Sequence, residues 1–199
     1  MNQLIILTLS VLLLGLICFT KTIPTLNLSG YSGCVLVLII SLICVVLIYR
    51  KNNIKITNET DKHLLVIRYL HYCVLVLTTC YVFIFSAASD TIFLIFMTLL
   101  SMHWMFFKGE CCLTYFEKKI TDPTYTIGSR PYHHIWLELV FGKYLDTFMV
   151  FMTLAMFFNA GIVIVRTVDN VTLKWILIMT LLFINIFFNM QRFSSEPNV

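Results

Sequence analysis

Long apolar runs recur along the whole chain and are separated by short polar connectors. A helix crosses the hydrocarbon core of a bilayer with about 20 apolar residues. The chain has only 12% charged residues, against about 25% in soluble domains. We therefore expect an all-α integral membrane protein with six transmembrane helices, arranged as three hairpins in one polytopic domain over residues 1–199. The predicted spans cover residues 4–19, 34–49, 64–88, 91–107, 145–165 and 171–189.

The largest polar stretch, residues 108–144, lies between the fourth and fifth predicted spans. Within it, residues 132–142 are again apolar, but fused with the next run they would be too long for one bilayer crossing. We therefore expect 132–142 to form an interfacial helix along the lipid headgroups. At the other end of the chain, the run 4–19 lacks the positive flank and the cleavage site of a signal peptide, which predicts a retained first helix.

The positive charges are distributed unequally between the two sides of this predicted topology. Of the fourteen Lys and Arg residues, Lys21, Arg166 and Lys174 fall on one side and the other eleven fall on the side of residues 50–63, 108–144 and the carboxyl tail. Cytoplasmic loops of membrane proteins carry the excess of Lys and Arg. The sequence therefore predicts that both termini and the region 108–144 are cytoplasmic.

The cysteines and the charge pattern limit the possible partners. Seven cysteines, an odd number that falls mostly inside apolar runs, do not suggest a disulfide framework. The adjacent Cys111 and Cys112 lie next to a predicted span, where cysteines can be palmitoylated. No basic run alternates with aromatic residues, so we expect no nucleic-acid partner. The expected partners are the lipid bilayer and other chains in the membrane, as a homo- or hetero-oligomer.

Ionisable residues near the ends of the third and fourth spans form a candidate polar cluster. Such residues at membrane depth tend to face the interior of a bundle and to pair with one another. In a hairpin centred near residues 88–89, Arg68 is level with Glu110, and His71 and His103 both lie near the cytoplasmic end. We therefore predict an ion pair between Arg68 and Glu110.

In the last predicted hairpin, two ionisable residues again lie at a similar depth. Asp146 opens the fifth span and Arg192 follows the sixth at a similar depth, which predicts a second ion pair. Asn159, Asn185 and Asn189 lie inside apolar runs, where amide side chains hydrogen-bond between helices.

A metal site is an alternative for the polar region. If the fourth helix continues beyond the bilayer, the spacing places a row of residues on one face, and a second polar group follows on the interfacial helix. The first row is His103, Phe107, Glu110, Thr114 and Glu117, and the second group is His133, His134 and Glu138. His103, Glu110, Cys111, His133, His134 and Glu138 are residue types that bind zinc or iron. Their spacing matches no ligand signature, so we expect interfacial anchoring rather than a metal at His103, His133, His134 and Glu138.

A haem is disfavoured for a related reason. Its axial histidines should come from facing spans, whereas His71 and His103 belong to one hairpin. We expect no cofactor.

Residues 103–117 also carry a resemblance. His103 and Trp104 are followed by Cys111, Leu113, Thr114 and Glu117 in the string C-C-L-T-Y-F-E. This string resembles a family of small multi-pass membrane proteins with a C-P-L-T-x-x-E motif, in which Cys112 replaces the proline. The longer string through residues 122–129 is similar to membrane proteins of large DNA viruses. The resemblance implies a multi-pass membrane protein and no particular activity.

These patterns favour a multi-pass membrane protein without catalytic activity, acting as a structural or interaction component. One alternative is a membrane-embedded, metal-dependent enzyme with its site between the end of the fourth span and residues 132–142. Another is a carrier or channel for small solutes, although the spans contain no interior proline and no row of charges that would line an ion path.

Overall fold

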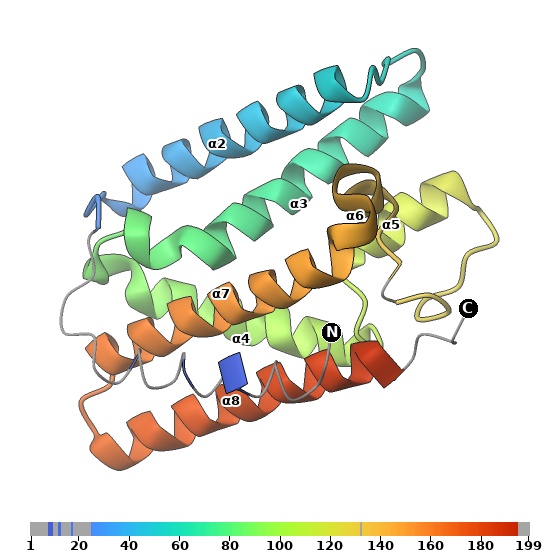
Figure 1. Ribbon diagram of the computed structural model, residues 1–199. Coiled ribbons are helices and arrows are strands. Elements are labelled where there is room, and N and C mark those ends of the chain that lie inside the picture. Colours follow the sequence, from blue (N-terminus) through green and yellow to red (C-terminus); the bar gives the residue numbers. More distant parts are fainter. Residues whose placement is uncertain (1–7, 10–11, 13–16, 18–24, 132, 195–199) are drawn as a thin grey trace.

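The structure is a bundle of long helices (Figure 1). The computed structural model describes residues 8, 9, 12, 17, 25–131 and 133–194, so the predicted first span at 4–19 falls largely outside the described residues. The long helices are α2 (Gly30–Lys51), α3 (Glu59–Ile84), α4 (Asp90–Phe106), α7 (Leu145–Thr167) and α8 (Val171–Ser194). Two shorter helices, α5 (Cys112–Thr121) and α6 (Ile135–Phe141), precede α7. The all-α fold class is confirmed.

Within the part of the chain that the structure describes, four stretches are long and apolar enough to cross a membrane. They are Gly30–Lys51, Glu59–Ile84, Ala87–Phe106 and Ile135–Thr167. The last has 33 residues and would extend about 50 Å as a continuous helix, but it is interrupted after α6 at Gly142, where φ is 48°. In α8 the apolar stretch found within the described side chains is the shorter Val171–Ile184. A membrane protein is therefore supported, and the count of six spans stays a prediction.

Helices α3 and α7 form the centre of the bundle. Helix α3 packs against α2, α5 and α7, and α7 also packs against α4 and α8. Figure 1 shows α5, α6 and the α2–α3 turn at one end of the bundle, and the α3–α4 and α7–α8 turns at the other. We call these two ends the cap end and the turn end.

The outer faces of the bundle are apolar. On α2, Leu38, Ile39, Leu42 and Ile43 are about half exposed, while Val45 is almost fully buried against neighbouring helices. A soluble protein rarely leaves so continuous an apolar surface in contact with water. These faces therefore fit contact with lipid chains.

Polar residues at the helix ends explain where some helices begin. Asn58 and Asp61 form a capping box at the start of α3, in which each side chain accepts a hydrogen bond from the other residue's backbone. Ser29 caps α2 through the backbone N–H of Ser32. The turn-end segment before α2 also pairs with the end of α3 through an isolated bridge between Leu28 and Phe85.

Helix α4 does not continue through the polar region, so the condition for one helical face from His103 to Glu117 is not met. The helix ends at Phe106, and Lys108 and Gly109 follow with φ values of 52° and 81°. Two successive residues in the left-handed region end a helix. A separate helix, α5, then begins at Cys112.

A buried amide joins the two central helices. Asn159 on α7 is fully buried. Its Nδ2 donates to the carbonyl oxygen of Thr79 (2.7 Å), and its Oδ1 accepts from the backbone N–H of Val82 (2.8 Å) on α3. The predicted role of Asn159 between helices is confirmed, whereas the side chains of Asn185 and Asn189 lie outside the described part.

Candidate functional site

The cap end is built around a short helix that buries its polar face. On α5, Thr114, Glu117 and Lys118 are each no more than 3% exposed, whereas Phe116 is 51% exposed. Charged side chains are rarely buried unless they are paired. The burial of this face therefore requires partners on other elements, and two ion pairs provide them.

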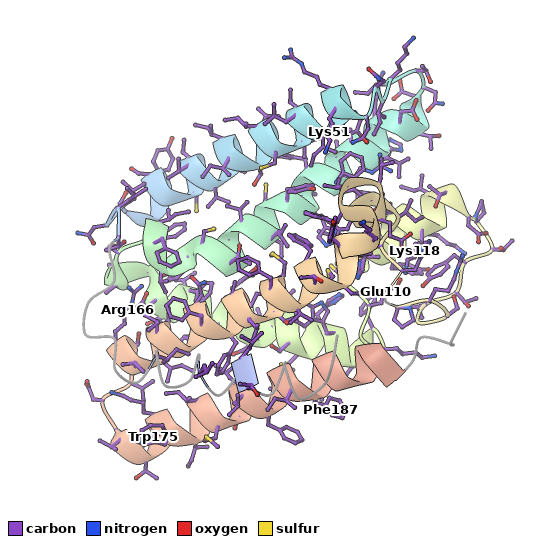
Figure 2. The ribbon with its side chains drawn as sticks, in the orientation of Figure 1. Lys51, Glu110, Lys118, Arg166, Trp175 and Phe187 are labelled. Atoms are coloured by element: carbon purple, nitrogen blue, oxygen red, sulfur yellow. The ribbon has the colours of Figure 1, made fainter. Side chains whose placement is uncertain are left out.

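Lys118 and Glu110 form the first pair, fully enclosed at the cap end (Figure 2). The Lys118 Nζ donates to Glu110 Oε1 at 2.6 Å and also to the carbonyl oxygen of Arg130. Glu110 accepts two further hydrogen bonds, from the Tyr125 hydroxyl (2.8 Å) and from the backbone N–H of Gly128 (3.0 Å). The pair therefore fixes the loop of residues 122–131 against α5.

Arg68 and Glu117 form the second pair, and this corrects the predicted partner of Arg68. The Arg68 Nε lies 2.8 Å from Glu117 Oε1, its Nη1 donates to the Tyr49 hydroxyl (3.1 Å), and its guanidinium stacks on the Trp136 ring at 4.3 Å. The predicted Arg68–Glu110 pair is wrong because the chain turns after Phe106, so that α5 packs on α3 and presents Glu117 there.

The two pairs meet on adjacent residues of one helix. Burial raises the pKa of Glu117, and the opposing effects of Arg68 and, more weakly, Lys118 do not cancel this shift. Desolvation penalises a buried carboxylate even when a cation is near. Glu117 and Lys118 thus tie α5 to α3 on one side and to the polar loop on the other.

The histidines predicted near the cap have separate partners. His103 Nε2 accepts the backbone N–H of Cys112 at 2.9 Å, which bridges the α4–α5 turn. His133 Nδ1 lies 2.5 Å from Glu138 Oε1, and both side chains are 38% exposed. Thr114 Oγ1 lies 3.4 Å from His134 Nδ1. These contacts connect α4, α5 and α6.

The structure does not gather the residues considered as alternative metal ligands. Within the described residues, no group of three or more His, Cys, Asp or Glu side chains is arranged so that it could hold a metal ion. The carboxylate of Glu110 is surrounded by Lys118, Tyr125 and Gly128. His103 is instead bound to the backbone at the start of α5. The cluster is therefore arranged as a set of internal contacts.

The remaining predicted residues have different environments. Burial raises the pKa of the Cys111 thiol, which lowers the fraction of the reactive thiolate. His71 makes no hydrogen bond to any residue that the structure describes, and it lines a cavity. Asp146 is half-buried near the start of α7, and the side chain of its predicted partner Arg192 lies outside the described residues.

A third ion pair lies at the turn end. Arg166 at the end of α7 contacts Asp90 at the start of α4 through Nε and Nη2, both at 2.5 Å. The Tyr81 and Thr167 hydroxyls also donate to this carboxylate, at 3.1 and 3.2 Å. The predicted spans leave Asp90 in the connector 89–90 and Arg166 in the connector 166–170, both on the same side of the membrane, but the sequence analysis does not pair them. Their shared depth was the signal that could have found this contact.

Comparisons with family models, curated proteins and solved structures find no match for the chain. The residues that sequence reasoning missed at the cap are Lys118 and Tyr125. A lysine next to Glu117 on a short amphipathic helix is normally a solvated residue. Its burial depends on the fold of the loop at 122–131, which no local pattern reveals.

Proposed function

We propose that the protein is a structural or interaction component of a membrane, whose cap end faces the cytoplasm and contacts another chain. The observation that carries the proposal is that the buried charged side chains of the cap are paired internally. Arg68, Glu110, Glu117 and Lys118 bind one another and the cap backbone. Such contacts shape a fixed surface beside the bundle.

The outer surface of the cap has features of a contact site. Phe116 is 51% exposed, and the nearby Lys119 is exposed as well. The Lys119 Nζ donates hydrogen bonds to the carbonyl oxygens of Pro123 and Tyr125. Aromatic residues dominate the binding energy of many protein interfaces. Phe116 is therefore the residue around which we place the contact with a second copy or another membrane protein.

Photocrosslinking in native membranes tests this contact. A photoreactive amino acid at position 116 should give a discrete crosslinked product, whereas the same group at Asn170, in the α7–α8 turn, should not. A chain that crosslinks at neither position and purifies as a monomer would contradict the proposal. One retained equivalent of zinc or iron, lost together with stability in chelator, would favour the enzyme alternative instead.

The orientation is tested separately. The excess of Lys and Arg at the cap end supports a cytoplasmic cap. In a cysteine-free background, Thr124→Cys should be protected from a membrane-impermeant maleimide in intact cells, and Asn170→Cys should react. The reverse pattern would overturn the orientation without affecting the crosslinking result.

A further inference from the structure

A cavity of about 180 Å³ lies inside the bundle, among α3, α4, α6 and α7, with α8 closing part of one side. It is comparable in volume to the ~150 Å³ apolar cavity that binds benzene. It belongs neither to the buried ion pairs of the cap nor to those of the turn end. Its lining residues change from polar to apolar along the bundle axis.

The end of the cavity nearest the cap is polar. His71 on α3, Cys111 before α5 and His134 before α6 line this part. Deeper residues include Met97 and Ala160. Because α3 and α7 run from the cap end towards the turn end while α4 runs back, the sequence positions place Met97 and Ala160 on the far side from the cap. The cavity therefore has a polar end and an apolar end.

His71 is the polar group without a partner. It forms no hydrogen bond with any described residue, while the hydroxyls of Thr78 and Ser101, which also line the cavity, donate to carbonyl oxygens of their own helices. His71 is half-buried, and a polar group that lines a largely apolar cavity without a hydrogen bond is costly. A ligand that hydrogen-bonds His71 would therefore gain affinity from satisfying it.

The lining also indicates the chemistry of the ligand. Among the described lining residues there is no Asp or Glu that could serve His71 as a charged partner. Burial raises the pKa of the Cys111 thiol, so it stays neutral. A carboxylic acid brings its own proton, so with the imidazole it forms a hydrogen-bonded pair that carries no net charge. The apolar depth matches a hydrocarbon chain.

We propose that this cavity binds a single-chain carboxylic acid of medium length, with the carboxylate at His71 and the chain extending between α4 and α7. The volume accommodates a chain of about six to eight carbons, by comparison with the benzene-sized cavity. This inference does not depend on the proposed interaction at Phe116.

Equilibrium binding of radiolabelled octanoate to the full-length protein in lipid nanodiscs tests the proposal. Saturable binding of one equivalent above empty nanodiscs is expected. His71→Leu should weaken binding at least tenfold, and Ala160→Leu, which fills the deep end, should do the same. His63→Leu changes an exposed histidine two turns earlier on α3 and should leave binding unchanged.

Competition with octanol identifies the head group. Octanol should displace octanoate from the wild-type protein only at concentrations at least tenfold higher than unlabelled octanoate, and His71→Leu should remove this preference. Equal displacement would overturn the carboxylic acid assignment. Absence of saturable binding, or unchanged binding in folded His71→Leu, would overturn the site. If Ala160→Leu does not fold, as judged by gel filtration and thermal unfolding, the His71 variant alone decides.

Discussion

The two ends of the bundle use buried ion pairs for different purposes. At the turn end, Asp90 and Arg166 join α4 directly to α7. At the cap end, Glu110 and Lys118 join a turn and a short helix that follow α4 (Figure 2). The turn-end pair therefore connects the long helices themselves, whereas this cap-end pair closes an added polar structure.

The exposure of the cations sharpens this difference. The Arg166 side chain is 25% exposed, whereas the Lys118 side chain is 2% exposed. A cation that can reach water when its partner is removed costs less than one left buried. The cap should therefore be the more sensitive end locally, and the turn end should be the more important one for the whole bundle.

The largest effect is expected for Glu110→Ala. It leaves the Lys118 ammonium buried without its carboxylate, which costs about 3–5 kcal/mol. Hydrogen exchange by mass spectrometry should show lost protection over residues 108–131, with little change in α7.

Glu59→Ala is the control for this prediction. Glu59 forms an exposed ion pair with Lys62, so removing its carboxylate should not measurably change protection from hydrogen exchange. Equal loss of protection in α7 and in the cap would contradict the idea that the Glu110–Lys118 pair closes a separate unit.

A smaller but global effect is expected for Asp90→Ala. The substitution removes two charge-assisted hydrogen bonds from Arg166, but the guanidinium can still reach solvent, so we expect a cost of about 2–3 kcal/mol. Thermal unfolding followed by a thiol-reactive dye should shift to lower temperature as one transition. Asp90→Asn keeps part of the hydrogen bonding, so its unfolding temperature should lie between those of Asp90→Ala and the wild type. A loss of protection confined to the α3–α4 turn would contradict a bundle-wide role.

Asn159→Leu should have an intermediate effect that belongs to neither end. Hydrogen bonds between membrane helices contribute about 1–2 kcal/mol, and leucine replaces the amide with a side chain of similar size. The same dye assay should show a smaller shift than for Asp90→Ala, with unchanged exchange in the cap. A larger shift in unfolding temperature than that of Asp90→Ala would show that Asn159 stabilises the bundle more than the turn-end ion pair does, contrary to this prediction.

The smallest effect is a pH dependence at Glu117. Because burial raises the pKa of Glu117 above its ordinary value of 4.5, the folded state binds a proton more tightly than the unfolded state. This contribution to stability is full below pH 4.5 and is lost as the pH rises through the raised pKa. The wild type should therefore lose stability relative to Glu117→Gln over that window, measured by thermal unfolding at several pH values. A difference that is constant with pH would show that Glu117 titrates normally.

The long helices could be predicted from the sequence because their apolar length is a local property. The predicted 91–107 and 145–165 agree closely with α4 and α7. The left-handed turn at Lys108 and Gly109, just after the predicted end of the fourth span, was not predicted, because a lysine in the left-handed region has no distinctive pattern. This turn lets α5 pack on α3, so that Glu117 rather than Glu110 meets Arg68.

The candidate site was predicted in composition but not in pairing. Arg68, Glu110 and Glu117 were singled out correctly as interior polar residues. Which carboxylate meets which cation depends on the turn after α4 and on the loop at 122–131, whose contacts span distant positions. Asp90 and Arg166 lie at the same depth in the predicted topology, so their pairing could have been predicted in the same way as a partner for Arg68.

The hydrogen bonds of Asn159 limit how the central helices can move. One side chain contacts the backbone of α3 at both a donor and an acceptor, so a slide of α7 along α3 by one turn, about 5.4 Å, would break both hydrogen bonds, at a cost of about 1–2 kcal/mol. That penalty favours the present axial register of the pair. Bending or rotation at the bundle ends keeps both hydrogen bonds of Asn159, so such a change of shape costs less there than a slide of α7 along α3.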